Sequence, residues 1–235
     1  MVLEKILKKI KKSLTKKSFY KRSYSQSGED MIVDFIFKTR NINNPTYLDI
    51  GAHQPYFLSN SAFFYKKECR GINIEPNPYL FKAFPKYRAE DINLNIGVGR
   101  ANEFMKFHIM SVSTMSTFSS AEAGKLEKEY GMKIMETIDV TVMTIDSILT
   151  KYNAGKFPDF LSLDVEGVDF DILKSIDYQV SYPKVICVET ISYSETGEGE
   201  KDTKIRTFLE EKGYMVFADT YINTIFVRKD FWVIK

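Results

Sequence analysis

Small and acidic residues stand at the ends of predicted buried strands, where a bound molecule could meet them. The strand predicted over residues 47–50 contains Asp49 and runs into Gly51, which has no side chain and lets a ligand approach the backbone closely. The next strand, predicted over residues 71–74, ends at Glu75. A carboxylate at that place in an α/β unit suits the paired hydroxyls of a ribose.

The same strand ends argue against a dinucleotide. The Gly-x-Gly-x-x-Gly pattern is absent from the chain, so a pyrophosphate would lack its usual cradle. A ligand with a ribose, an amino-acid end and no phosphate fits better, namely S-adenosylmethionine (SAM), whose ammonium Asp49 could meet. Two alternatives stay open: a nicotinamide-dependent oxidoreductase on a similar sheet, and a structural reading in which Gly51 is a turn and Glu75 a solvated strand end.

The elements that position these residues alternate along the chain from residue 25. Further strands are predicted over residues 92–98, 104–109, 138–142, 160–165 and 185–188, with a hairpin of residues 215–218 and 225–228. Helices are predicted over residues 31–37, 57–67, 79–84, 145–152, 170–176 and 204–212, and a loop over residues 110–124. Continuous apolar strands joined by helices predict a doubly wound α/β domain, residues 25–235, with a mainly parallel seven-stranded sheet.

Charge is spread unevenly over the 235 residues. The net charge is +2, yet residues 1–22 carry nine Lys or Arg and one acid, whereas the remainder carries 24 bases and 30 acids. Apolar residues at helical spacing predict a basic amphipathic helix over residues 1–24, which would lie on an anionic membrane surface or pack on its own domain or a partner chain. The mildly acidic remainder gives no indication of a general nucleic-acid binder.

Composition and cysteine usage indicate the compartment. No apolar run approaches the roughly 20 residues that span a bilayer, and no secretory signal opens the chain. Cys69 and Cys187 lie in apolar strand-like contexts without CxxC spacing, as reduced core residues do. We therefore expect a cytoplasmic protein, with the basic helix as its one candidate for peripheral contact with the membrane.

Six strings resemble the FkbM-like family of SAM-dependent methyltransferases. They are YSQSGEDMIVDF, YLDIGAHQPYFLSNS, GINIEPNP, LNIGVG, LSLDVEGVDFDIL and PKVICVET, and they occur in this order from about Ser25 to Thr190. The resemblance implies the class I methyltransferase fold (Rossmann-like) and methyl transfer to an oxygen. It also implies an acceptor such as a carbohydrate, either a nucleotide-linked sugar or a surface glycan.

The resemblance also implies which residues bind SAM. Asp49 and Gly51 would flank its methionine part and Glu75 its ribose. The cofactor site would be completed by Gly97 and Val98 at the adenine, Asp164 on the next strand, and Gln26 on a segment that folds over SAM. Pro55 stands where many members have glycine, which puts the shape of that loop in doubt. The opening segment has a plainer reading as the N-cap of a helix, with Glu29 and Asp30 facing the helix dipole.

A sugar hydroxyl is a poor nucleophile and must lose a proton during the transfer. The catalytic candidates are His53, Asp164 and Glu166, any of which could act as a general base. Alternatively, His53, Asp164 and Glu189 could converge at neighbouring strand ends and hold a divalent metal ion. A third interpretation gives His53 and Glu189 no role in the chemistry, and a non-catalytic scaffold that keeps the fold is the remaining functional class. The sequence leaves the oligomeric state open, a homo-oligomer included.

Overall fold

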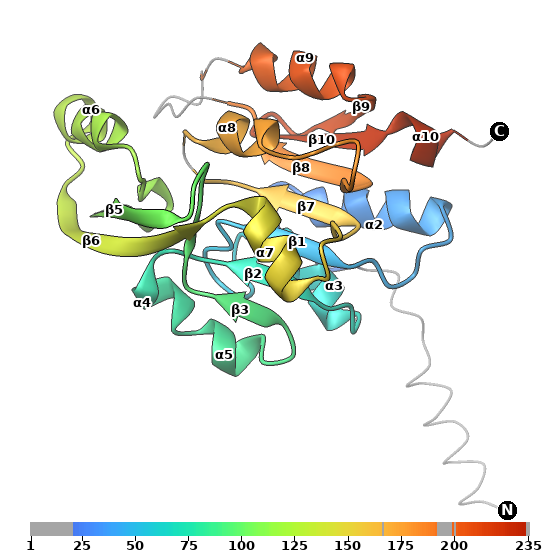
Figure 1. The fold of residues 1–235 in the computed structure, drawn as a ribbon, viewed down its shortest axis with the longest axis horizontal. Helices are drawn as coiled ribbons and strands as arrows, with labels where there is room; N and C mark the ends of the chain where they lie inside the picture. Colours follow the sequence, from blue (N-terminus) through green and yellow to red (C-terminus); the bar gives the residue numbers. More distant parts are fainter. Residues whose placement is uncertain (1–20, 166, 192–198, 200, 234–235) are drawn as a thin grey trace, which may run out of the picture.

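A seven-stranded sheet forms the centre of the protein, in the order β3-β2-β1-β7-β8-β10-β9 (Figure 1). The computed structural model describes residues 21–165, 167–191, 199 and 201–233. The strands are β1 Tyr47–Ile50, β2 Gly71–Ile74, β3 Ile92–Leu94, β7 Phe160–Leu163, β8 Val185–Glu189, β9 Tyr214–Asp219 and β10 Asn223–Arg228. β10 is antiparallel to both of its neighbours, and the other pairings are parallel. The predicted mainly parallel sheet is confirmed.

Helices cover both faces of this sheet because successive strand residues point to opposite sides. Tyr47 and Phe160 belong to one apolar cluster, and the neighbouring Leu48 and Leu161 belong to the other. The first cluster includes residues of α2 (Glu29–Thr39), α3 (Ala62–Lys66) and α10 (Lys229–Trp232). The second includes residues of α7 (Ile145–Tyr152), α8 (Asp169–Lys174) and α9 (Thr203–Glu211). The strand order reverses between β1 and β7, which is where ligands bind in sheets of this kind.

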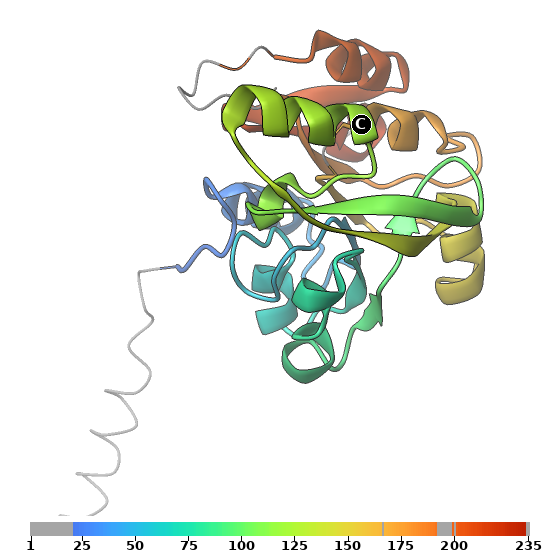
Figure 2. The same cartoon turned by 90° about the vertical axis from the view of Figure 1, so that its left-hand side faces the viewer.

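A second, three-stranded sheet lies beside the carboxyl ends of the main strands. It is built from β4 (Gly97–Val98), β6 (Ile134–Met143) and β5 (Glu103–Met110), in that order. The 3-10 turn η1 (Ser113–Met115) and the helix α6 (Ser120–Tyr130) follow β5. Figure 2 shows β5 and β6 crossing in front of the main sheet. We call β4, β5, β6, η1 and α6 together the cap.

Two predictions within this region are wrong. Residues 92–98, expected as one strand, form β3 in the main sheet and β4 in the cap. Residues 110–124, expected as a loop, contain η1 and the start of α6. The Ser/Ala/Gly-rich composition concealed α6, which buries only Ala123 and Leu126 and is capped by the side chain of Ser119. The region 79–84 likewise contains two short helices, α4 (Pro78–Phe81) and α5 (Phe84–Tyr87), in place of one.

The helix predicted over residues 145–152 is confirmed as α7. Thr144 caps it, because its hydroxyl accepts a hydrogen bond of 3.1 Å from the Ser147 amide. The C-terminal hairpin is present as β9 and β10. Most of the predicted N-terminal helix lies outside the described residues, and residues 21–24 are not helical. Within the described ranges, no helix is long and apolar enough to cross a membrane.

Candidate active site

A cavity of about 510 Å³ opens at the carboxyl ends of β1, β2, β7 and β8, under the cap. The end of each of these four strands contributes one residue to the lining: Gly51, Glu75, Asp164 and Glu189. The predicted convergence of strand-end residues is therefore present. The cavity has the size and the position of a ligand site in a doubly wound sheet.

The turn after β1 brings the chain closest to the next strand. Gly51 has a left-handed φ of 78°, and its amide donates to the carbonyl oxygen of Ile74 at 3.0 Å. A Cβ at this position would overlap the backbone carbonyl oxygen of Asp164. Glycine is therefore required here both for the backbone conformation and for the close approach of β1 to β7.

Glu75 is buried at the end of β2 and holds two loops. Its Oε2 accepts a 2.8 Å hydrogen bond from the His53 amide, and its Oε1 accepts a 2.7 Å bond from the Asn77 amide. Burial raises its pKa to about 8, although both hydrogen bonds favour the charged form and oppose that shift. Each carboxylate oxygen keeps a further lone pair for a ligand hydroxyl.

Asp49 lies beneath the cavity and does not line it. Its carboxylate accepts a short hydrogen bond from the Ser61 hydroxyl, and burial raises its pKa. The same Ser61 hydroxyl receives a 3.1 Å bond from the guanidinium of Arg88, which is fully buried and also donates to the carbonyl oxygen of Pro55 at 3.1 Å. The structure therefore assigns Asp49 to a buried network that supports the loop after β1.

Gly97 and Val98, predicted to lie at the adenine, are also found outside the cavity lining. Both are buried in β4 of the cap, and neither lines the cavity. A Cβ at Gly97 would meet the rings and methyl groups of Phe118 and Val142, so this glycine serves the packing of the cap. The residues that do line the cavity on this side are Pro76 and Leu80, after β2.

The opening segment reaches the cavity through Gln26, as predicted. Asp30 is buried and accepts hydrogen bonds from the Ser23 hydroxyl and the Tyr24 amide, both at 2.7 Å. Glu29 is also buried and accepts from the Thr220 hydroxyl at 2.7 Å. These acids do more than face the dipole of α2: Asp30 holds the opening segment to the start of the helix, and Glu29 fastens it to the β9–β10 hairpin.

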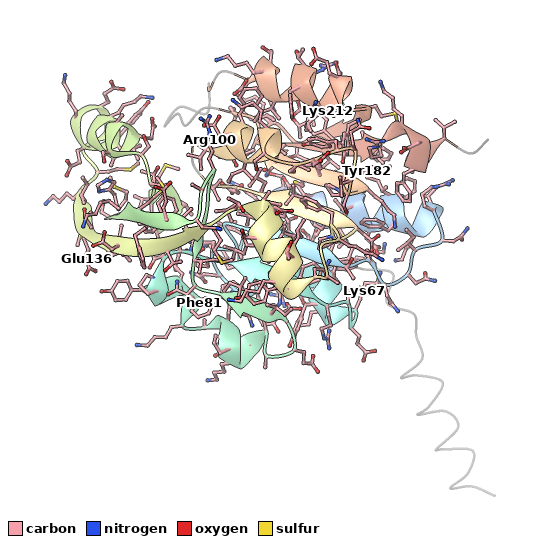
Figure 3. All side chains as sticks on the ribbon, viewed as in Figure 1. Lys67, Phe81, Arg100, Glu136, Tyr182 and Lys212 are labelled. Atoms are coloured by element: carbon pink, nitrogen blue, oxygen red, sulfur yellow. The ribbon has the colours of Figure 1, made fainter. Side chains whose placement is uncertain are left out.

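The cap closes the cavity from the other side. Ser113, Thr114 and Ser116 place hydroxyl groups along the lining, and Phe107 and Phe118 add apolar surface. Side-chain contacts join the cap to the loops and helices at the strand ends. Among them, the Tyr79 hydroxyl of α4 donates to Glu136 of β6 at 2.8 Å (Glu136 is labelled in Figure 3), and His53 Nε2 lies 3.1 Å from the Ser113 hydroxyl.

Asp164 and Glu189 form the acidic floor of the cavity between the main sheet and the hairpin. Asp164 is exposed at the cavity, yet the protein atoms around its carboxyl group displace part of its water shell. This desolvation, followed by repulsion from Asp169 and Asp49, raises its pKa. Desolvation also raises the pKa of Glu189, with repulsion from Asp164 adding to the shift. Among the described lining residues there is no Lys or Arg to neutralise these carboxylates.

Among the residues with described positions, no three His, Cys, Asp or Glu side chains are grouped to hold a metal ion, so the predicted site of His53, Asp164 and Glu189 is not preformed and stays a prediction. The imidazole Nε2 of His53 lies 3.1 Å from the Ser113 hydroxyl, and its Nδ1 is enclosed without a hydrogen-bond partner. Burial lowers the pKa of His53. Glu166, the remaining catalytic candidate, lies outside the described residues.

The Methyltransferase FkbM domain profile matches residues 49–216, which is most of the chain. The chain belongs to the FkbM family of methyltransferases. Each of the strand-end residues Gly51, Glu75, Asp164 and Glu189 falls within the FkbM match. No curated protein sequence matches the chain significantly.

Solved structures of other methyltransferases resemble the FkbM chain at low identity. One is the 1,6-didemethyltoxoflavin-N1-methyltransferase of Burkholderia thailandensis, with 6% identity, coverage of 86% of this chain and 77% of that one, and a TM-score of 0.41. Another is the precorrin-6y C5,15-methyltransferase of Geobacter metallireducens, with 14% identity, coverage of 91% and 95%, and a TM-score of 0.40. The α/β architecture of this FkbM protein is Rossmann-like, with the strand order described above.

Sequence reasoning missed one wall of the FkbM cavity. Tyr221, Ile222 and Asn223, from the turn of the hairpin, all line it. Asn60, from the loop before α3, also lines it and donates to the Ser162 hydroxyl at 3.2 Å. The signal for the turn was the polar sequence between two predicted strands, but its position beside β8 follows from strand pairing (Asn223 opposite Glu189), which the sequence does not show.

Proposed function

We propose that this protein is a SAM-dependent O-methyltransferase that acts on a hydroxyl group of a carbohydrate. The observation that carries the proposal is that one cavity is lined by two kinds of residue. Gly51 and Glu75 are suited to a ribose and an amino-acid end. The carboxylates of Asp164 and Glu189 and the serine and threonine hydroxyls of the cap are suited to an acceptor that carries hydroxyl groups. Membership of a methyltransferase family supports this assignment.

The residues present fit SAM better than a dinucleotide. Buried Glu75 can accept hydrogen bonds from both ribose hydroxyls, and Gln26 can close over the ligand from the opening segment. SAM supplies a methyl group on a positively charged sulfonium, which suits a cavity with acidic lining and no described Lys or Arg. A pyrophosphate would meet like charge there. The same argument favours a sugar unit of a glycan over a nucleotide-linked sugar as the acceptor.

The chain's own residues would then remove a proton from the acceptor. Asp164 or Glu189, when ionised, can accept the proton of a hydroxyl group that lies above the acidic floor, and His53 is the alternative base. The cap would exclude water from the acceptor, and its serine and threonine hydroxyls would orient the sugar. Alignment of the acceptor oxygen with the methyl group and sulfur can lower a barrier by about 7–11 kcal/mol.

A calorimetric titration of the full chain with S-adenosylhomocysteine (SAH) and, separately, with NAD tests the cofactor. We expect micromolar binding of SAH and no binding of NAD. Binding of NAD alone would replace the proposal with a nicotinamide-dependent oxidoreductase. Binding of SAH without turnover of any sugar acceptor would favour the non-catalytic scaffold, and binding of neither ligand would contradict the proposed cofactor site.

Above the raised pKa of Glu75, about 8, replacement of Glu75 by alanine should weaken SAH binding by about 10- to 150-fold, because the ribose hydroxyls lose a charged acceptor worth about 1.5–3 kcal/mol. The two amides that Glu75 now holds would add to the loss through a looser His53 loop. Calorimetry measures the change, with Glu103→Ala on the exposed side of β5 as the control for a lost carboxylate. Equal SAH affinity in the two variants would remove Glu75 from the site.

The basic segment at the N-terminus stays a separate proposal, since it lies outside the described residues. Its amphipathic pattern supports contact with an anionic membrane, where a glycan acceptor would be assembled. Sedimentation of the full chain with anionic vesicles, compared with neutral vesicles, tests this. Equal recovery in the supernatant with both would argue for packing on its own domain or on a partner chain.

A further inference from the structure

Tyr221 presents an aromatic ring at the mouth of the cavity from a strained backbone position. It lies in the turn between β9 and β10, lines the cavity, and is 51% exposed. Lys201 Nζ lies over its ring, 5.8 Å from the centroid. Its φ is 75°, in the left-handed region that residues with a bulky side chain rarely adopt. Strain of this kind persists only where the surrounding structure imposes it, and it gathers at ligand-binding sites.

Hydrogen bonds on both sides hold the turn in this conformation. The Tyr221 amide donates to Asp219 Oδ1 at 2.7 Å. The next contacts come from outside the hairpin: buried Glu29 accepts from the Thr220 hydroxyl at 2.7 Å and from the Asn223 side-chain amide at 3.1 Å. The opening segment therefore fixes the turn that carries Tyr221.

The rest of the acceptor side supplies polar groups. Glu189 lies opposite Asn223 in the strand register, so the acidic floor begins close to the turn. Across the cavity, Ser113, Thr114 and Ser116 offer hydroxyls. An aromatic face combined with carboxylates and hydroxyls matches a sugar ring, whose C–H face is apolar and whose edge carries hydroxyl groups.

We propose that Tyr221 is the stacking platform for the acceptor's sugar ring and thereby determines the specificity of this site for carbohydrates. The Tyr221 ring would cover the apolar face of the sugar, while the hydroxyl groups of the sugar would face the acidic floor and the cap. The proposal rests on the proposed function, since it assumes that this half of the cavity receives the acceptor. It requires a role for Tyr221 in acceptor binding and none in cofactor binding.

The test is saturation-transfer NMR on the full chain with saturating SAH and, as probes, the methyl glycosides of glucose, galactose, mannose and fucose. We expect at least one glycoside to receive saturation, most strongly at the ring protons of one face. Tyr221→Gly should reduce that signal at least tenfold while raising the midpoint of thermal unfolding, because glycine relieves the left-handed conformation. Tyr221→Phe should keep the signal, and SAH affinity should stay within twofold in both variants.

The control is Phe104→Ala, which removes another aromatic ring, 74% exposed on β5 and outside the cavity lining. It should leave saturation transfer unchanged. Failure of the wild type to bind SAH would overturn the proposed function itself. SAH binding with no saturation of any glycoside, or an undiminished signal in Tyr221→Gly, would overturn the role of Tyr221 and leave the cofactor assignment standing.

Discussion

Replacement of Gly51 by alanine is expected to lower SAH affinity more than 100-fold, whereas Gly155→Ala leaves the affinity within threefold of wild type. Both glycines have left-handed backbones, with φ of 78° and 72°. Both variants therefore incur a comparable conformational cost of about 1–2 kcal/mol. The two sites differ in the room that they leave for a side chain. Nothing lies near a Cβ at Gly155, whereas the carbonyl oxygen of Asp164 blocks a Cβ at Gly51.

The loss of SAH affinity in Gly51→Ala follows from the backbone that must move to make room for the alanine side chain. The carbonyl oxygen of Asp164 belongs to the chain directly after β7, and the Asp164 amide donates to Ile50 at 3.0 Å. Separation of these two segments breaks the strand-end geometry and shifts the loop that carries His53. Calorimetry with SAH gives the affinity, and thermal unfolding of both variants reports the shared backbone cost. SAH affinity in Gly51→Ala equal to that of Gly155→Ala would show that this turn does not border the cofactor.

The sequence predicts the main sheet well because its strands are buried on both faces. Segments such as residues 47–50 and 160–163 are short and mostly apolar. Each has one polar residue, Asp49 or Ser162, whose side chain is buried and hydrogen-bonded. The carboxyl ends of parallel strands meet at one edge, so the presence of Gly51, Glu75 and Asp164 at one cavity follows from the fold class alone. That inference needs no knowledge of side-chain conformation.

What the sequence could not show depends on conformation and on packing between distant segments. Asp49 turns away from the cavity because Ser61 and the buried Arg88 lie beneath it, 12 and 39 positions further along the chain. His53 has a left-handed backbone, with a φ of 50°, and its Nε2 lies 3.1 Å from the Ser113 hydroxyl of the cap. Neither the network around Asp49 nor the contact of His53 with the cap has a signature in local composition.

Replacement of Asp164 by asparagine is expected to lower kcat by about 10²- to 10⁴-fold, the range for loss of a general base. SAH affinity should change by less than tenfold, because Glu75 and Gly51 remain. The pH profile of kcat/KM identifies the group. Carboxyl groups ordinarily titrate near pH 4, and desolvation together with repulsion from neighbouring acids raises the pKa of both Asp164 and Glu189. Only the ionised form accepts a proton, so activity should rise with pH through an acidic limb well above pH 5.

The position of that limb separates the carboxylates from His53. Burial lowers the pKa of His53 below its usual 6.5, so a histidine base would place the limb on the acidic side of that value. A carboxylate base whose pKa is raised places it higher, and the limb should shift in Asp164→Asn. Asp171→Asn, which removes an acid of α8 paired with Lys174 at 2.9 Å outside the cavity, is the control. An unshifted limb in Asp164→Asn would assign the proton to Glu189 or His53.

Stability gives the same residue a second, independent readout. An acid whose pKa is raised on folding keeps its proton in the native state after the unfolded chain has lost it, so stability falls as pH rises from the ordinary value toward the raised one. Asp164 opposes folding in this way in the free protein. We therefore expect Asp164→Asn to unfold at a higher temperature than wild type at pH 8 and at the same temperature at pH 4. A variant less stable than wild type at pH 8 would mean that Asp164 supports the fold, and its loss of activity would then say nothing about catalysis.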